Sequence, residues 1–329
     1  MKQQGLAFIL ALLAVWLKEG KMEIIIQFIL LLLGFKLLDK GADWFVKGAA
    51  GLASKFGISQ LVIGLTVVAM GTSAPEAAVS IAAAFQGSAD ITIGNILGSN
   101  IMNILVILGC TAAITPLIVR SSTTRVELPF VIGISLLLLY QGKDGSVSRM
   151  DGIVLTFFFI IYLAYAYYMA KKEKEIETLS DKQLSLVRCL AYMFIGLVVL
   201  IVGSKLTVFS ASAIALYAGL SERFIGLTVV AFGTSLPELF TCVTAARTGN
   251  ADIAIGNIVG SNIFNILFVV GLSALIIDIP FAVAFAFDSY VAVATAFLLW
   301  LLVLPKNSLP RWAGIVLLFS YAVYFIHIL

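Results

Sequence analysis

Histidine and cysteine are nearly absent from this 329-residue chain, which contains one histidine and three cysteines. Cys110, Cys189 and Cys242 are far apart, odd in number and embedded in apolar runs. We therefore predict buried thiols, and neither a disulfide framework nor a metal knuckle. His327 lies close to the end of the chain, where we expect an interface residue rather than a proton relay. With so few soft ligands, the sequence does not favour a zinc, copper or iron site.

Charged residues are also scarce, at 12% of the chain against 61% hydrophobic residues. A soluble globule of this length cannot bury so much apolar surface, so we predict an integral membrane protein whose solvent is the lipid bilayer. The net charge of +3 is too small to indicate a nucleic-acid partner. Nothing in the sequence indicates a cofactor or an obligate protein partner.

Long apolar stretches, by contrast, follow one another along the chain, and each can cross or nearly cross the hydrocarbon layer. They lie at approximately 23–40, 60–84, 90–114, 126–141, 151–170, 186–216, 224–245, 252–277, 281–304 and 309–328. We therefore predict an all-α membrane protein with ten transmembrane helices. Residues 1–21 hold a shorter apolar run and are treated as a leader-like segment with no assigned role, with Met22 as an alternative start.

A polar linker, residues 171–183, separates five stretches from five and divides the chain into halves at 22–170 and 184–329. Twelve Lys and Arg residues fall in the loops on the side of this linker, and only three fall in the opposite loops. The positive-inside rule then predicts a cytoplasmic linker and outside termini, in a cell (plasma or inner) membrane. Because five is odd, the second half enters the bilayer from the opposite side.

One stretch of the sequence occurs twice. The first motif, Gly64–Glu76, reads GLTVVAMGTSAPE, and the second, Gly226–Glu238, reads GLTVVAFGTSLPE. The two repeats, 63–105 and 225–267, are offset by 162 residues and identical at 29 of 43 positions. Polar and small residues are the ones retained, which indicates a shared site. Two inverted-topology five-helix repeats are the sequence signature of an alternating-access transporter with its site near the midplane.

Each motif places a glutamate inside an apolar span, at a cost of roughly 2.5–3.5 kcal/mol for an ionised side chain. No lysine or arginine lies nearby in either motif span, so a bound cation is the expected partner of Glu76 and Glu238. The hydroxyls on the same helix faces are Thr72, Ser73, Thr234 and Ser235. Pro75 and Pro237 break the helices and loosen the carbonyls of about residues 69–72 and 231–234.

The span after each motif adds a polar stripe. Its members are Asn95, Ser99 and Asn103 in the first repeat, and Asn257, Ser261 and Asn265 in the second. For Asn95, Asn257, Asn100 and Asn262, helix packing and ion ligation remain equal alternatives. The GxxxG glycines at 94, 98, 256 and 260 are expected to let the motif helices approach closely. For Asp90 and Asp252 we expect helix caps, with residues at the mouth of an ion path as the alternative.

These groups are all hard oxygen ligands, which suit Ca²⁺ or Na⁺. The two GTS-x-PE motifs, each followed by GN-x-x-GSN-x-x-N, resemble the α-repeats of the Ca²⁺/cation antiporter superfamily, in its prokaryotic Na⁺/Ca²⁺ exchanger branch. The resemblance implies exchange of about three Na⁺ for one Ca²⁺ by sliding of the first and sixth helices over the rest. The ligands it implies are Glu76, Glu238, Thr72, Thr234, Ser73, Ser235, Ser99, Ser261, Asn103 and Asn265, with the carbonyls of Ala69 and Ala231.

The chain departs from some relatives at Asn265, where they carry an aspartate. We interpret this departure as evidence against K⁺ co-transport and for a site charge of −2. A Ca²⁺/H⁺ antiporter is the main alternative function. A cation channel would not need an inverted repeat. An intramembrane hydrolase would need a nucleophile and base that the motifs lack, so we predict no enzymatic activity.

Overall fold

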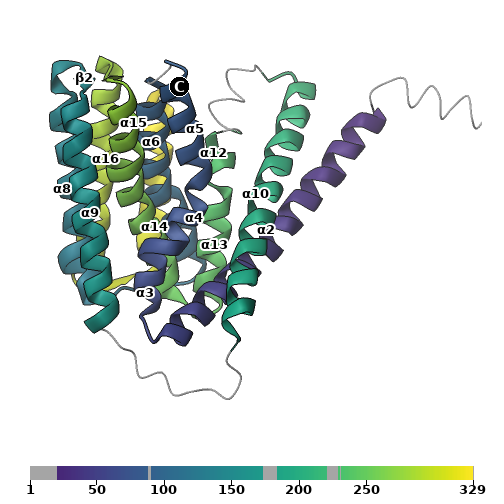
Figure 1. Cartoon of the computed structure of the whole chain (residues 1–329). Helices are drawn as coiled ribbons and strands as arrows, with labels where there is room; N and C mark the ends of the chain where they lie inside the picture. The colour runs from purple at the N-terminus through teal and green to yellow at the C-terminus, as the bar shows by residue number, and fades with distance from the viewer. Residues whose placement is uncertain (1–20, 88–89, 173–183, 221–228, 230, 329) are drawn as a thin grey trace, which may run out of the picture.

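The computed structural model describes residues 21–87, 90–172, 184–220, 229 and 231–328 (Figure 1). The leader-like segment, nearly all of the linker and the start of the second motif therefore lie outside the described residues. In the first part of the chain the helices are α2 (Lys21–Phe56), α3 (Gln60–Ile63), η1 (Gly64–Val68), α4 (Ala69–Thr72), α5 (Ala74–Phe85), α6 (Asp90–Met102), η2 (Asn103–Leu108), α7 (Gly109–Ile114), η3 (Thr123–Glu127), α8 (Leu128–Gln141), η4 (Gly142–Asp144) and α9 (Arg149–Lys172).

The second part of the chain repeats much of this order. Its helices are α10 (Leu186–Tyr217), α12 (Ala231–Thr234), α13 (Leu236–Arg247), α14 (Ala251–Phe264), η6 (Asn265–Val270), α15 (Gly271–Ile276), α16 (Val283–Val303) and α17 (Arg311–Ile328). The segments η1, η2, η3 and η6 are π-helical and η4 is a 3₁₀ turn. Both η2 and η6 begin at a predicted asparagine ligand, and wide π turns of this kind occur frequently at functional sites.

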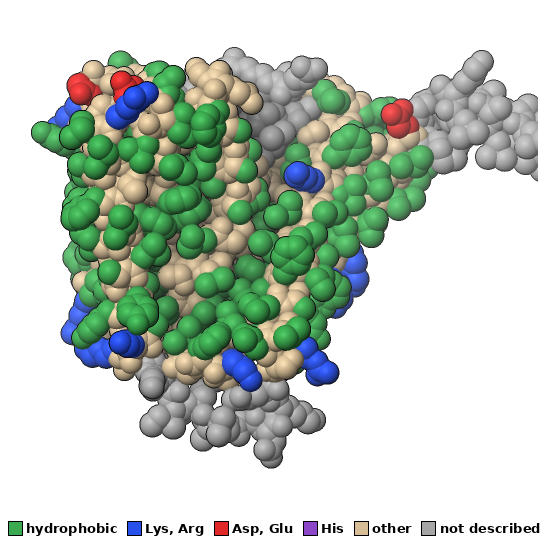
Figure 2. Space-filling view, viewed as in Figure 1, with side chains coloured by type: hydrophobic (Ala, Val, Ile, Leu, Met, Phe, Trp, Pro, Cys, Tyr) green, Lys and Arg blue, Asp and Glu red, His purple; other side chains and the backbone are tan. Residues whose placement is uncertain are grey.

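Helices long and apolar enough to cross a membrane dominate the described residues. Seven qualify, and the bent pair formed by Gln60–Thr72 and Ala74–Phe85 makes an eighth. This confirms a predominantly helical protein with many candidate membrane spans. Figure 2 shows an apolar surface along the length of the molecule, with Lys and Arg side chains gathered mostly at its lower end in this view.

Two short antiparallel β-ribbons were not predicted. β1 (Leu117–Ile118) pairs with β4 (Ser308–Leu309), and β2 (Ser146–Val147) pairs with β3 (Ile279–Pro280). The repeat offset of 162 residues maps β1 onto β3 and β2 onto β4, so each ribbon is the counterpart of the other. The sequence did not indicate this pairing between distant loops, because its dominant pattern is one of apolar runs of helix length.

The helices form two groups in Figure 1: α2 and α10 lie side by side as a tilted pair, and the other helices form a compact bundle. Glycines make the contact within the pair close. A Cβ atom at Gly196 would lie 2.6 Å from the backbone nitrogen of Phe45, and one at Gly41 would lie 2.8 Å from that of Leu200. Small residues that let backbones approach are the usual means of helix association in lipid.

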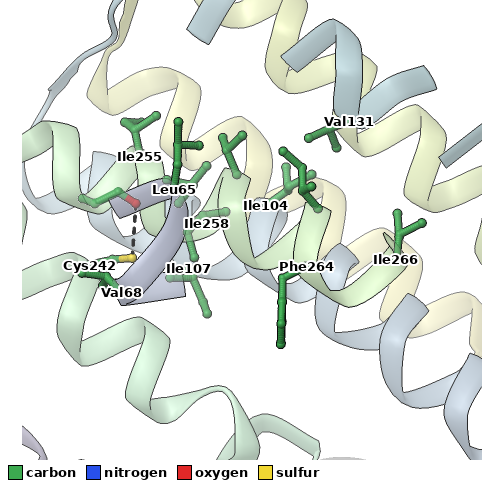
Figure 3. Close-up of a cluster of buried hydrophobic side chains, with 14 of the residues drawn as sticks. Leu65, Val68, Ile104, Ile107, Val131, Cys242, Ile255, Ile258, Phe264 and Ile266 are labelled. Carbon is green, nitrogen blue, oxygen red and sulfur yellow. Dashed lines mark hydrogen bonds between the residues drawn. The ribbon is translucent and has the colours of Figure 1, made fainter. Parts of the chain in front are cut away.

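The centre of the bundle is formed by α6–η2–α7 and α14–η6–α15. In both of these spans 83% of the most apolar 18-residue stretch is buried inside the protein, against 28% for α9 and 17% for α17. Figure 3 shows the apolar side chains that fill this centre, among them Leu65, Ile107, Ile258 and Phe264. The polar stripes of the two repeats therefore lie on the most deeply buried helices of the molecule.

Candidate cation-binding site

Both motif helices are broken at the residue that follows the threonine. Ser73 has φ −83° and ψ 5°, and the helix axis bends by 51° between α4 and α5. Ser235 has nearly the same conformation, with φ −91° and ψ 4°, ahead of α13. Pro75 and Pro237 cause these breaks because a proline removes one helical hydrogen bond and clashes with the preceding turn. The two breaks lie at equivalent positions, as the sequence predicted.

The backbone oxygen of Ala69 lies among hydroxyl groups from both repeats. It accepts a hydrogen bond from Thr72 Oγ1 at 3.4 Å and one from Ser261 Oγ of α14 at 3.5 Å. The backbone nitrogen of Ser73 also donates to it, at 3.0 Å. Three predicted ligands, Ala69, Thr72 and Ser261, are thus brought together, although Ser261 is 192 residues from Ala69 in the chain.

Glu76 and Glu238 are buried, with 2% and 1% of their surface exposed. Ser73 Oγ donates to Glu238 Oε1 at 3.1 Å, so a hydroxyl of the first motif contacts the carboxylate of the second. Within the described residues, the Oε2 atom of each glutamate has no hydrogen-bond partner and no lysine or arginine forms an ion pair with either group. In their ionised form, two buried carboxylates in this arrangement would need a compensating positive charge.

Four asparagines form a reciprocal network across the centre of the site. Asn100 Nδ2 donates to the Asn262 carbonyl and Asn262 Nδ2 donates to the Asn100 carbonyl, both at 3.3 Å. Asn103 Nδ2 donates to Asn262 Oδ1 at 2.9 Å, and Asn265 Nδ2 donates to Asn100 Oδ1 at 3.1 Å. The Nδ2 groups of Asn103 and Asn265 therefore already form hydrogen bonds. Their Oδ1 atoms are buried with no partner among the described residues. Asn100 and Asn262 orient the other two amides.

Asn257 and Asn95 make hydrogen bonds within the site. Asn257 Oδ1 accepts from Thr72 Oγ1 at 3.0 Å, and its Nδ2 donates to Cys242 Sγ at 3.3 Å. Asn95 Nδ2 donates to Ser80 Oγ at 2.9 Å and to the Glu76 carbonyl at 3.4 Å. These bonds favour the packing interpretation of both residues over direct ligation. Cys242 is buried and free, as predicted, but sequence reasoning missed its contact with the site.

The second motif is held partly by α10. Ser204 Oγ donates to the Gly233 carbonyl at 2.7 Å, which is the carbonyl that Pro237 was predicted to release. The equivalent residue on α2 is Ala42, so the first motif has no such bond and no sequence signal pointed to Ser204. Ser235 Oγ is buried without a partner among the described residues. Ala231, the other predicted carbonyl ligand, begins α12.

A cavity of about 140 Å³ reaches the site beside α17. Ser99 and Thr234, both predicted ligands, line it together with Asn95, Tyr321 and Tyr324. The close helix approach expected at the GxxxG glycines is found at Gly260 of the second repeat but not at Gly98 of the first. A Cβ at Gly260 would lie 2.4 Å from the Leu65 carbonyl, whereas none of the described atoms lies within 4 Å of a Cβ at Gly98. The helices meet tightly at α14 and η1 but leave space beside α6.

The expectation of a helix cap at Asp252 is wrong. Asn250 occupies the N-cap of α14, and Asp252 in its first turn pairs with Arg120 at 2.6 Å. An arginine brought close by the fold outcompetes a local backbone bond because a charge-assisted pair is the stronger interaction. The side chain of Asp90, its counterpart, is outside the described part of the structure.

Comparison with known proteins matches this architecture. The family described as "Sodium/calcium exchanger protein" matches residues 26–168 and 189–329. The chain belongs to the sodium/calcium exchanger family. It is 30% identical over 345 residues to the sodium/calcium exchanger MaX1 of Methanosarcina acetivorans, which covers 92% of this chain and 98% of that protein. It is 38% identical to the inner membrane protein YrbG of Escherichia coli, covering 75% of this chain and 79% of YrbG.

A solved structure of the sodium-calcium exchanger NCX_Mj is also similar, with a TM-score of 0.80 and 36% sequence identity. The match covers 92% of this chain and 99% of that one. Family membership thus confirms the predicted resemblance and supports a role in membrane transport, since the relatives with a named activity are exchangers. The hard oxygens gathered from both motifs are the ligand type that Ca²⁺ and Na⁺ prefer.

Proposed function

We propose that the chain is a sodium/calcium antiporter that works by alternating access and exchanges about three Na⁺ for one Ca²⁺. The observation that carries the proposal is the pair of buried carboxylates, Glu76 and Glu238, each with an oxygen that has no partner among the described residues. Their two negative charges can be neutralised by one Ca²⁺ or by two Na⁺, with a third Na⁺ held by dipoles. A site that holds either load but not both is what an antiporter requires.

The proposed ligands are the oxygen atoms that converge from the two motifs and the two polar stripes. The Oδ1 atoms of Asn103 and Asn265 are supported by the orienting bonds from Asn100 and Asn262. The Ala69 carbonyl is supported by its position among two hydroxyls. The full proposed set is Glu76, Glu238, Thr72, Thr234, Ser73, Ser235, Ser99, Ser261, Asn103, Asn265, Ala69 and Ala231.

Alternating access is proposed to arise from α2 and α10 sliding as a unit over the remaining helices. The glycine contacts between them support a paired movement, because they bring the two backbones into close contact at several positions along the helices. The bond from Ser204 to the Gly233 carbonyl supports coupling of that movement to the second motif. The inverted arrangement of two five-helix halves, with repeats at 63–105 and 225–267, belongs to the same proposal.

The proposed orientation places the 171–183 linker in the cytoplasm and both termini outside. It rests on the excess of Lys and Arg in the loops on the linker side. With ordinary ion gradients, an antiporter of this kind would extrude Ca²⁺.

Radioactive Ca²⁺ uptake into proteoliposomes tests the function. Vesicles loaded with Na⁺ are diluted into Na⁺-free buffer, and we expect Ca²⁺ uptake that the Na⁺ gradient alone drives and that depends on membrane potential. Glu76→Gln in matched vesicles serves as the negative control, since its amide retains the shape but not the charge.

A pH gradient in place of the Na⁺ gradient separates the main alternative. Uptake driven only by the pH gradient would replace the proposal with Ca²⁺/H⁺ exchange through the same glutamates. Uptake without any opposing gradient, at the rate of an open pore, would instead indicate a channel.

A further inference from the structure

Cys242 is a buried thiol whose single hydrogen atom is already used in a hydrogen bond. It lies on α13, one helical turn beyond Glu238. Its Sγ donates to the Ala254 carbonyl of α14 at 3.5 Å (Figure 3). Because a thiol has one S–H, the same sulfur can only accept from its other polar neighbour. That neighbour is Asn257, whose Nδ2 donates to Sγ at 3.3 Å. The thiol therefore requires the N–H side of the Asn257 amide.

The Asn257 amide is consequently held in one of its two orientations. An amide carries donors on its nitrogen and acceptors on its oxygen, so its neighbours decide which way it is turned. With Nδ2 on Cys242, Oδ1 faces Thr72 and accepts from Thr72 Oγ1 at 3.0 Å. All three residues are fully buried, so bulk water does not compete for these hydrogen bonds.

Thr72 is a proposed cation ligand, and the direction of its hydroxyl proton decides whether it can act as one. The hydroxyl carries one hydrogen and two lone pairs, and a cation binds on the lone-pair side. The Ala69 carbonyl, also a proposed ligand, is the alternative acceptor at 3.4 Å. A proton turned toward Ala69 would occupy that carbonyl. A proton held by Asn257 leaves both oxygens available to an ion.

The first repeat contains the same arrangement with oxygen in place of sulfur. The 162-residue offset maps Cys242 onto Ser80. It also maps Asn257 onto Asn95. Asn95 Nδ2 donates to Ser80 Oγ at 2.9 Å, which is the counterpart of the bond to the thiol. Two different side chains that make the same bond at equivalent positions indicate that each position supplies an acceptor for the amide.

We propose that Cys242 and Asn257 are positioning residues for cation binding. Cys242 sets the orientation of the Asn257 amide, and Asn257 directs the Thr72 proton away from the bound ion. Neither positioning residue touches the ion. The inference rests on the proposed function in taking Thr72 as a Ca²⁺ ligand, but it does not depend on which ion is exchanged for Ca²⁺.

Equilibrium binding of radioactive Ca²⁺ to the purified full-length chain in detergent measures this effect. Cys242→Ala removes the acceptor, so we expect the Kd to rise roughly fivefold, as for the loss of one hydrogen bond. Cys242→Ser supplies an acceptor of the type found at Ser80, and the Kd should return to near the wild-type value. Cys110→Ala is the matched control, because no hydrogen bond of the proposed ligands within the described residues involves Cys110.

A double-mutant cycle with Thr72→Val separates positioning from a general structural effect. Valine keeps the shape of threonine but has no hydroxyl, so Asn257 has no proton to direct. In the Thr72→Val background, Cys242→Ala should raise the Kd by less than about twofold, because changes that act on one group are not additive. A merely structural effect would be the same in both backgrounds. Cys242→Val, which fills the space of the thiol without a polar atom, replaces Cys242→Ala if that variant fails to fold.

An equal rise of the Kd in both backgrounds would overturn the proposal, as would failure of Cys242→Ser to restore binding. An unchanged Kd in both Cys242→Ala and Cys242→Val would do the same. A wild-type chain that binds Ca²⁺ but shows no Na⁺-driven uptake would contradict the proposed antiport while leaving the binding cycle intact. A wild-type chain that binds no Ca²⁺ would overturn both.

Discussion

Asn100 and Asn262 bond to each other reciprocally, since the side-chain amide of each donates to the backbone carbonyl of the other at 3.3 Å. Their own Oδ1 atoms then accept from Asn265 and Asn103. This arrangement fixes which way the amides of Asn103 and Asn265 are turned, and it leaves their oxygens available to a cation. Two residues outside the proposed ligand set thus determine the orientation of two residues within it.

Asn100→Ala should therefore weaken Ca²⁺ binding without unfolding the protein. It removes the acceptor for Asn265 Nδ2, and a lost hydrogen bond of this kind is worth about 1 kcal/mol, or roughly a fivefold rise in the KM for Ca²⁺. The measurement is Na⁺-driven uptake over a range of Ca²⁺ concentrations. A positioning role predicts a rise in KM that exceeds any fall in maximal rate, and an unchanged KM would contradict it.

Glu76→Gln and Glu238→Gln should each abolish Ca²⁺ transport. The amide can still accept the bond that Ser73 donates to Glu238, so the fold should be retained while the charge is lost. Uptake in Na⁺-loaded proteoliposomes is the measurement, and Glu23→Gln at the exposed start of α2 is the control for changing a carboxylate elsewhere. Full activity in either motif variant would mean that the site assignment is wrong.

Much of the proposed site could be inferred from the sequence, because the same motif residues occur twice at one constant offset. The glutamates, the hydroxyls and the proline breaks could all be placed by helical spacing within one span. The partners of Asn103 could not, because Asn262 reaches it through the packing of two helices 159 residues apart in the chain. Ser204 and Arg120 were missed for the same reason. Their roles depend on which helix lies opposite, which a single hydrophobic pattern does not encode.

Ser204→Ala should destabilise the second motif. The Gly233 carbonyl loses its 2.7 Å partner and stays buried near a proline break, which costs about 1–3 kcal/mol. Thermal unfolding in detergent should detect the loss, and the transport rate should fall because α10 would no longer be tied to the motif. Ser320→Ala is a matched control, since that hydroxyl bonds to a carbonyl of its own exposed helix. Equal behaviour of the two variants would exclude the proposed coupling.

Gly41→Val should separate α2 from α10. A side chain at this position would meet the Leu200 backbone nitrogen at 2.8 Å and the Gly196 carbonyl at 2.9 Å, and a backbone cannot move aside as a flexible side chain can. Overpacking of this kind costs about 1–3 kcal/mol or more, so we expect lower stability and a loss of transport. Gly133→Val is the control, because none of the described atoms lies within 4 Å of a Cβ there. Normal transport by Gly41→Val would argue against a tightly paired movement.

Asn265→Asp should change the ion coupling, because it adds a third negative charge beside Glu76 and Glu238. Asn265 is 1% exposed and its Oδ1 has no partner among the described residues, so the new charge would be buried within the proposed site and would need a further cation. We expect the reversal potential of Na⁺-driven Ca²⁺ flux to shift, and uptake to become dependent on K⁺ or on pH. Asn103→Asp, at the equivalent position of the first repeat, is the matched variant. If Asn265→Asp leaves the reversal potential and the K⁺ dependence unchanged, then the charge of the site does not set its ion selectivity. The two asparagines would then not be the reason why the exchanger is independent of K⁺.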